Sequence, residues 1–172
     1  MRIVEGRLHV GPDPPDGVPA YESVPALVNE LEDASEAGTA VQAFDARYVA
    51  GREHLETAVA HANRSVERGE NVADDRSVEI LCYAAGRRQI DRALAMGVGE
   101  GTTPVLVVAD GPAEDRVADR VGTLVASVAT LEEGEPDRIR EFFDVTPAEQ
   151  DATDAPLADL VCERVALLDV EK

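Results

Sequence analysis

The chain has no tryptophan and few other aromatic residues. Aromatic side chains make up 3% of its 172 residues, with three Tyr and three Phe. Because 44% of the residues are nonetheless hydrophobic, a globular core has to be built from Val, Leu, Ile and Ala, and a chain of this length buries most of its apolar surface in about one domain. So few aromatic rings disfavour a surface that binds nucleic acid mainly by stacking its bases.

Lysine is almost absent as well. Of the 16 basic residues, 15 are Arg and the single Lys is Lys172, and 35 acidic residues bring the formal net charge to −19. Apolar periodicity runs through nearly the whole chain, which argues against disorder as the reason for this acidity. We interpret the composition as halophilic, because a dense carboxylate surface keeps a folded protein soluble in concentrated salt.

Cysteine is rare, and metal motifs and membrane segments are missing. Cys82 and Cys162 lie inside apolar runs and are interpreted as small buried hydrophobic residues. No CxxC pair or other metal spacing occurs, so neither a metal nor a cofactor is predicted. No run approaches the roughly 20 apolar residues of a membrane span, and no signal-peptide core is present. The protein is therefore predicted to be cytoplasmic, without membrane contact.

The common catalytic motifs are also missing. The sequence contains no Walker phosphate loop, GxGxxG, GxSxG or HExxH. His54 and His61 are seven residues apart on one expected helix, and two solvated histidines are the simpler interpretation of that spacing. No catalytic residue is predicted. A small acid/base enzyme using His54, Tyr83 or Asp91 is kept as an alternative.

What is present is a regular alternation of apolar segments. Strands are expected at residues 2–10, 39–45, 78–84, 104–109 and 127–131. Helices are expected at residues 23–36, 51–68, 87–96, 113–125, 135–144 and 156–168, with a polar loop at 151–156. The run 78–84 is the most apolar and is predicted to be a central strand. The alternation indicates an α/β fold, a single domain spanning residues 1–172 in which a parallel or mixed sheet is layered with helices.

The arginines are concentrated in the middle of the chain. Residues 40–100 hold 8 basic and 10 acidic residues, whereas residues 1–39 hold 2 and 8 and residues 101–172 hold 6 and 17. A nearly neutral, Arg-rich region on so acidic a protein favours contact with an anionic partner. The net charge does not forbid RNA, because the screening length is only about 3 Å at 1 M salt.

The most distinctive local pattern is YAAGRRQI at residues 83–90. A buried strand would pass through a turn at Gly86 into a helix whose first turn carries Arg87, Arg88 and Gln89. Free amides at that helix start, together with the guanidinium groups, would bind a phosphate. Alternatively, Gly86 only permits the turn and the arginines pair with neighbouring Asp and Glu; the residues alone leave both interpretations open.

Five blocks of the sequence resemble the kinase-binding small subunit of the KEOPS complex, the family that includes the archaeal and fungal counterparts of the PRPK-binding protein (TPRKB). The blocks, in this order, are YVAGREHL at 48–55, NVA at 71–73, VEILCYAAGRRQI at 78–90, AL at 93–94 and GV at 97–98. The closing ERVALL at 163–168 also resembles the last helix of the family. Residues 1–39 and 110–155 show little resemblance, and Arg stands where the family commonly has Lys.

The resemblance implies a non-catalytic subunit of the complex that places threonylcarbamoyl on tRNA adenosine. Such a subunit docks on the kinase/ATPase subunit and holds the 3′ CCA end of tRNA. By the match of the motifs, the resemblance predicts RNA contacts at Arg52, His54, Arg87, Arg88 and Gln89. Arg47 and Arg64 are added to this set from their charge alone.

The same resemblance places kinase docking on four apolar residues of the last helix, for which core packing is the alternative role. These residues are Leu160, Val161, Val165 and Leu168. The alternative function is a regulatory protein-docking module that does not bind RNA.

Overall fold

The computed structural model describes residues 1–170 and has the predicted α/β class, with a mixed sheet. Its strands are β1 (Arg2–Val10), β2 (Ala20–Tyr21), β3 (Ala40–Asp45), β4 (Gly101–Asp110) and β5 (Ala126–Ser127). Its helices are α1 (Val24–Ala34), α2 (Arg52–Arg68), α3 (Arg76–Ala85), α4 (Ile90–Ala93), α5 (Glu114–Val121), α6 (Pro136–Phe142), α7 (Pro147–Asp151) and α8 (Leu157–Leu167). Two short 3₁₀ turns, η1 (Ala46–Tyr48) and η2 (Leu94–Met96), complete the set.

The chain forms two compact units. One, here called the sheet unit, consists of residues 1–46 and 97–133 and contains all five strands. The other, here called the helical unit, consists of residues 47–96 and 134–172. The chain therefore passes between the units three times. The assignment of residues 1–172 to one domain stays a prediction.

The sheet has the strand order β2-β1-β4-β3, with β5 paired to part of β1. β1 and β4 are antiparallel in an unbroken register from Arg2 opposite Ala109 to Val10 opposite Gly101. β3 is antiparallel to β4, whereas β2 is parallel to β1. The sheet is thus mixed, which decides between the two arrangements that the sequence left open.

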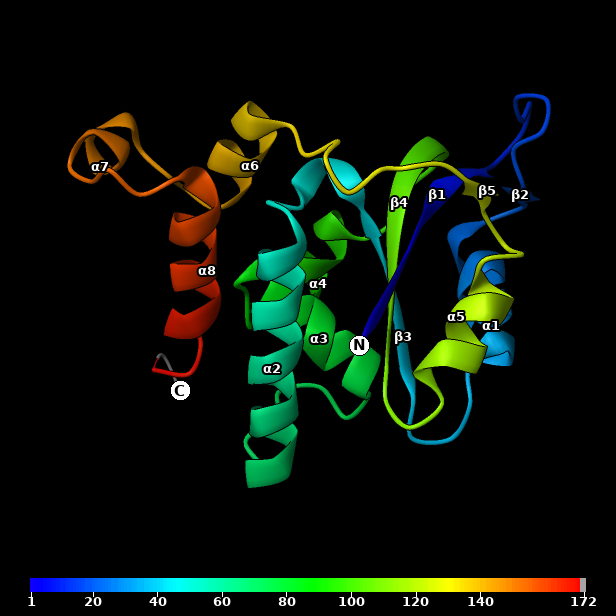
Figure 1. The fold of residues 1–172 in the computed structure, drawn as a ribbon, viewed down its shortest axis with the longest axis horizontal. Coiled ribbons are helices and arrows are strands. Elements are labelled where there is room, and N and C mark those ends of the chain that lie inside the picture. Colours follow the sequence, from blue (N-terminus) through cyan, green and yellow to red (C-terminus); the bar gives the residue numbers. More distant parts are fainter. Residues whose placement is uncertain (171–172) are drawn as a thin grey trace. The chain divides into compact units, whose positions relative to one another are not determined.

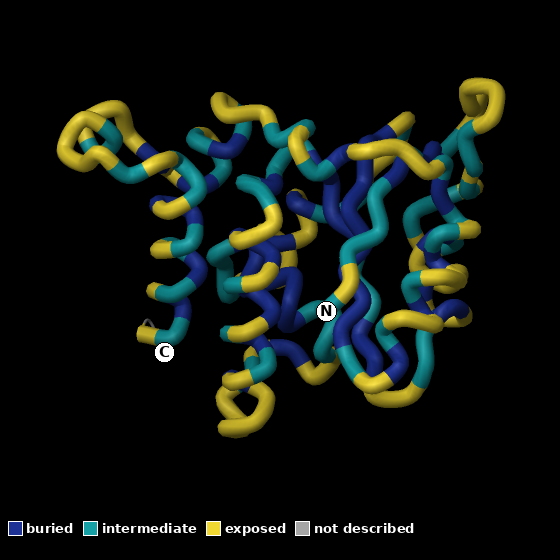
Figure 2. The backbone as a smooth tube through the Cα atoms, viewed as in Figure 1, coloured by how far each residue is buried: buried dark blue, intermediate teal, exposed yellow. Residues whose placement is uncertain are grey.

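The core of the sheet unit lies between one face of the sheet and the helices α1 and α5 (Figure 1). α1 begins where predicted, because the Ser23 side chain accepts a hydrogen bond from the backbone N–H of Ala26 at 3.3 Å. Its buried residues Leu27 and Leu31 are one turn apart and face the sheet. β4 is buried from its third residue to its last, as Figure 2 shows, whereas the first half of β1 is exposed or half-buried.

The central strand predicted at residues 78–84 is wrong, because this segment is the buried helix α3. Asp75 caps its start by accepting hydrogen bonds from the N–H groups of Ser77 (2.8 Å) and Val78 (3.1 Å). A short, continuous apolar run looks alike whether it is a buried strand or a helix buried on most sides. β4 takes the central place in the sheet instead.

Three smaller predictions also need correction. The helix expected at 87–96 is reduced to α4 and the following 3₁₀ turn η2. The strand expected at 127–131 contains only Ser127 of the short β5. The loop expected at 151–156 is preceded by the helix α7, which was not predicted. The Thr146 side chain caps the start of α7 by accepting a hydrogen bond from the N–H of Glu149, and Pro147 is its first residue.

Candidate functional site

Gly86 of the segment YAAGRRQI caps the end of the helix α3, and the next helix, α4, begins only at Ile90. Gly86 has φ = 58°, its N–H bonds to the carbonyl of Tyr83 at 2.9 Å, and the N–H of Arg87 bonds to the carbonyl of Cys82 at 3.0 Å. This hydrogen-bond pair is the glycine cap of a helix C-terminus. The predicted phosphate site on helix-start amides is therefore wrong, because a helix C-terminus carries partial negative charge.

Arg87 is held inside the helical unit. Its Nη2 donates to the carbonyl of Phe142 at 2.6 Å and to Oδ2 of Asp144 at 3.0 Å. Its guanidinium also lies 5.7 Å from the centre of the Phe142 ring. Because Phe142 ends α6, Arg87 places a positive charge at a helix C-terminus, where it stabilises the last carbonyls.

His54 is a buried residue whose two ring nitrogens bond to the backbone, so the RNA contact predicted for it stays an untested prediction. Its side chain is 0% exposed, its Nδ1 accepts from the N–H of Ala50 at 3.1 Å, and its Nε2 lies 2.7 Å from the carbonyl of Ala84. Since Nδ1 is the acceptor, the proton of the neutral ring is on Nε2 and is donated to Ala84. Burial lowers the pKa of His54 to about 4.

The remaining predicted RNA residues are spread over the helical unit. Arg52 is exposed and lies 3.7 Å from Glu56 on the same helix, and Arg64 is exposed twelve residues further along α2, about 18 Å away. Arg47 and Arg88 are half-buried and each takes part in a further contact within the fold. The exposed Gln89 precedes α4 without capping it through its side chain.

The structure instead gathers aromatic rings and arginines that are far apart in the sequence. The rings of Tyr48 and Phe142 meet edge to face, with 5.1 Å between their centres. The guanidinium of Arg138 lies 5.2 Å from the Tyr48 ring, and that of Arg87 lies over Phe142. We call Tyr48, Arg87, Arg138 and Phe142 the Arg–aromatic cluster; all four are half-buried and thus partly open to solvent.

Sequence reasoning missed this cluster because Arg138 and Phe142 lie outside the recognised motifs, although Tyr48 and Arg87 lie within them. Tyr48 and Arg138 are 90 positions apart in the sequence and meet only in the folded chain. The usable signal was composition: two of the six Tyr and Phe residues, Phe142 and Phe143, are adjacent and lie in an otherwise charged segment.

The four apolar residues predicted to dock the kinase are buried. Leu160 and Leu168 are 4% exposed, and Val161 and Val165 are 0% exposed. They pack in the core, as the alternative considered for them has it, and present little surface to a partner; their part in kinase docking stays a prediction. Two other large apolar side chains lie at the surface: Ile90, the last residue of the RQI motif, is 40% exposed, and Leu94, four positions later, is 59% exposed.

The side chains proposed for an acid/base enzyme have separate partners. The Tyr83 hydroxyl donates to Oδ1 of Asp169 at 2.6 Å, whereas both bonds of His54 are to backbone groups. Burial, followed by the Asp169 contact, raises the pKa of Tyr83 to about 12. Within residues 1–170, no three His, Cys, Asp or Glu side chains are arranged to hold a metal ion.

Two comparisons with known proteins bear on the site. A family model described as kinase binding protein CGI-121 matches residues 23–169. A search of curated proteins finds no match. In the part of the chain that the structure describes, no helix is long and apolar enough to cross a bilayer.

Proposed function

The chain belongs to the family of the kinase-binding protein CGI-121, and from this premise we propose that it is a non-catalytic subunit of a KEOPS-type complex, which docks on the kinase/ATPase subunit and binds the 3′ CCA end of tRNA. The family match over residues 23–169 is the observation that carries the kinase partner. The RNA partner rests on the sequence resemblance and on the Arg–aromatic cluster.

Ile90 and Leu94 are the docking residues that we propose in place of the buried residues of α8. They are four positions apart at α4 and η2, while Ala93 between them is 0% exposed and anchors the segment. Fully burying an exposed large aliphatic side chain contributes about 1.5–3 kcal/mol. Ile90 and Leu94 are still 40% and 59% exposed, so part of this free energy is not gained in the free chain. A partner that covers them recovers part of that free energy, as at the apolar centre of other protein interfaces.

The docking proposal is tested with the double substitution Ile90→Glu and Leu94→Glu. We expect the dissociation constant for the purified kinase subunit to rise about 100-fold, because the charges would be buried without a partner. The matched control is Val28→Glu, which changes an apolar residue of α1 in the sheet unit that is 43% exposed. Equal kinase binding by the double variant and the wild-type chain would remove these residues from the interface.

The Arg–aromatic cluster is the RNA contact that we propose. Unpaired nucleotides such as a CCA end are bound by stacking on aromatic rings and guanidinium planes. Tyr48 and Phe142 supply ring faces and edges, and Arg138 and Arg87 supply cations beside them. At high salt such direct contacts have to carry the affinity, since counterion release is then weak.

The RNA proposal is tested by tRNA binding at high salt. We expect trimming of the terminal CCA, or the substitution Arg138→Glu, to weaken binding by about tenfold or more, on the scale of one lost stacking contact. The control is Arg140→Glu on the same helix; Arg140 bonds to Asp137 and Gln150 and is outside the cluster. Unchanged binding after both CCA trimming and Arg138→Glu would leave the protein-docking function without an RNA site.

That second function, a regulatory docking module without RNA binding, is favoured by one specific observation. Arg87, the central residue of the predicted RNA motif, is committed to Phe142 and Asp144. The tRNA assay separates the two functions, because both predict the same loss of kinase binding for the Ile90 and Leu94 variants. We also propose that the protein is cytoplasmic and comes from a halophilic archaeon. The concentrated salt of the tRNA assay matches the conditions inside such a cell.

A further inference from the structure

One edge of the sheet is incompletely paired. On the side of β1 away from β4, β2 pairs with His9 and Val10, and β5 pairs with Gly6 and Arg7. The chain then leaves the sheet, so in the described residues the segment from Arg2 to Glu5 has β4 as its one strand partner.

The register shows which backbone groups face this open edge. The N–H of His9 donates outward to Pro19 at 2.9 Å, and that of Gly11 donates outward to Tyr21 at 2.8 Å. Backbone direction alternates along a strand, and the register of β1 with β4 has no break. The N–H and C=O groups of Ile3 and Glu5 therefore point to the same outer edge.

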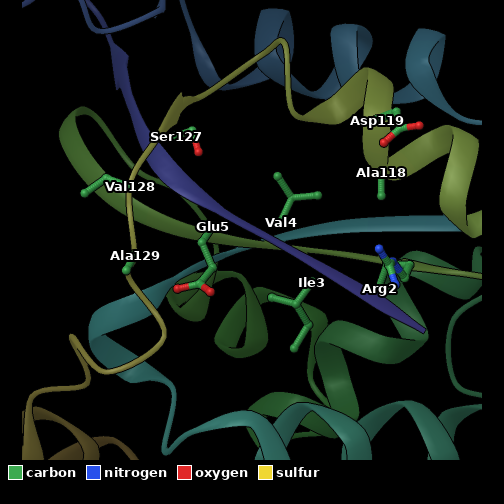
Figure 3. A pocket seen from close by; sticks show the side chains of 9 residues that line it. All are labelled: Arg2, Ile3, Val4, Glu5, Ala118, Asp119, Ser127, Val128 and Ala129. Atoms are coloured by element: carbon green, nitrogen blue, oxygen red, sulfur yellow. The ribbon is translucent and has the colours of Figure 1, made fainter.

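A groove runs along that edge. It has a volume of about 360 Å³ and is lined by β1 residues 2–5, by Ala118 and Asp119 of α5, and by residues 127–129. Figure 3 shows the chain after β5 diverging from β1, with Val4 extending into the space between them and α5. An added strand would lie about 4.8 Å from β1, where the unpaired groups of Ile3 and Glu5 become its hydrogen-bond partners.

The charges that line the groove indicate what kind of strand fits. Arg2 is paired with Asp115 at 3.2 Å, so it contributes no unpaired positive charge. Two carboxylates remain, Glu5 and Asp119, and Glu5 is fixed in place by the N–H groups of Thr130 (2.7 Å) and Leu131 (2.8 Å). A second copy of this chain would bring another net charge of −19 to this edge, which is less favourable than a basic segment.

We propose that this groove binds an extended segment of a partner protein that carries Arg or Lys, by adding it as a strand to β1. The backbone of Ile3 and Glu5 provides the affinity, and Asp119, on the α5 side of the groove that Val4 also faces, selects the basic side chain. This surface lies in the sheet unit, whereas the kinase and tRNA contacts proposed above lie in the helical unit. The inference is therefore independent of them.

The test uses short synthetic peptides on the full chain. A basic alternating peptide, TVRVTVRT, is expected to bind and to slow hydrogen exchange of the Ile3 and Glu5 amides, measured by NMR. Two control peptides are expected to bind at least about tenfold more weakly. They are the acidic peptide TVEVTVET and the basic peptide with alternate backbone nitrogens methylated. Equal binding of the acidic peptide, or protection confined to other amides, would overturn the proposal.

Two variants complete the experiment. Asp119→Arg is expected to weaken the basic peptide at least about tenfold, because it replaces attraction by repulsion. The control is Asp33→Arg, another exposed acid on a helix of the sheet unit, outside the groove. If both variants bind the basic peptide like the wild type, or if the free chain protects the Ile3 and Glu5 amides by self-association, the proposal is wrong.

Discussion

The two units of this chain use charge in different ways. Residues 1–46 and 97–133 hold 4 basic and 16 acidic residues, whereas residues 47–96 and 134–172 hold 12 and 19. In the sheet unit the described arginines pair with carboxylates at the surface, as Arg2 does with Asp115. In the helical unit Arg87 and Arg164 bond to the carbonyls that end α6, and Arg87 and Arg138 lie against aromatic rings.

This difference shows where each unit obtains its stability and its binding surfaces. The sheet unit relies on its strand ladder and an aliphatic core, and its acids keep it soluble. The helical unit uses buried polar groups and arginines to join helices whose ends meet. Its polar contacts are therefore expected to be the more sensitive to substitution and to pH.

The largest effect is expected from removing the buried histidine of the helical unit. His54→Ala would leave the N–H of Ala50 and the C=O of Ala84 without their partner and open a cavity, at a cost of about 4 kcal/mol in the free energy of unfolding. Urea denaturation measures it. A loss below about 1 kcal/mol would contradict the structural role given to the ring.

The same residue predicts a pH dependence. The pKa of His54 is about 4 in the folded chain, below its ordinary value of 6.5. The unfolded chain therefore binds more protons between these values, and stability is lost as the pH falls from about 6.5 to 4, by about 3 kcal/mol in all. His54→Ala should remove this part of the pH dependence. If the free energy of unfolding of the variant still falls with pH in the same way, other groups are responsible for this pH dependence.

The next effect belongs to the backbone of the sheet unit. Gly111 has φ = 144°, and a Cβ there would overlap the carbonyl oxygen of Gly38. Gly111→Ala is expected to cost about 3 kcal/mol, from both the backbone strain and the overlap. Gly11→Ala is the control: its φ is 106°, but a Cβ would meet nothing within 4 Å, so only about 1 kcal/mol is expected. Equal losses would show that the overlap relaxes freely.

The sequence predicted those features that depend on neighbouring residues. Ser23 begins α1 and Gly69 ends α2, as expected, because a cap is formed by residues within one turn. The strands β1, β3 and β4 also lie close to the predicted ranges. Local chemistry is sufficient for elements of this kind.

What was missed depends on contacts distant in sequence. The run 78–84 has the same apolar content as a central strand, and only its packing against α2 distinguishes a helix. Arg87 was predicted to contact RNA from its motif alone, and its partners Phe142 and Asp144 are more than fifty positions away. The structure therefore differs from the sequence-based prediction more at the candidate site than in the fold class.

A smaller effect is expected from an arginine pair of the helical unit. Arg164 contacts both oxygens of Glu149, at 2.7 and 2.8 Å, and its Nε lies 3.4 Å from the carbonyl of Phe143. Both side chains are about 70% buried, so solvent weakens the pair only in part. Arg164→Met should cost about 1 kcal/mol by urea denaturation. If Arg164→Met leaves the free energy of unfolding unchanged, the pair contributes no more than an ordinary surface ion pair.

The smallest effect is expected from the corresponding pair in the sheet unit. Glu36 lies 2.7 Å from Arg116 and 2.8 Å from Arg120, whose side chains are 68% and 51% exposed. The hydrogen bond from Arg116 lowers the pKa of Glu36 below its ordinary value. Its contribution to stability is thus present above the pKa of the unfolded chain and lost as the pH falls through that of the folded chain.

Arg116→Met should therefore raise the pKa of Glu36, followed by NMR titration of its carboxyl group, and by linkage lower the stability near neutral pH, by less than Arg164→Met does because Arg120 still pairs with Glu36. The effect is small because solvent and salt screen the exposed guanidinium of Arg116, which is 68% exposed. A loss of stability as large as that of Arg164→Met would remove the distinction between the two units, because arginines would then stabilise both to the same extent.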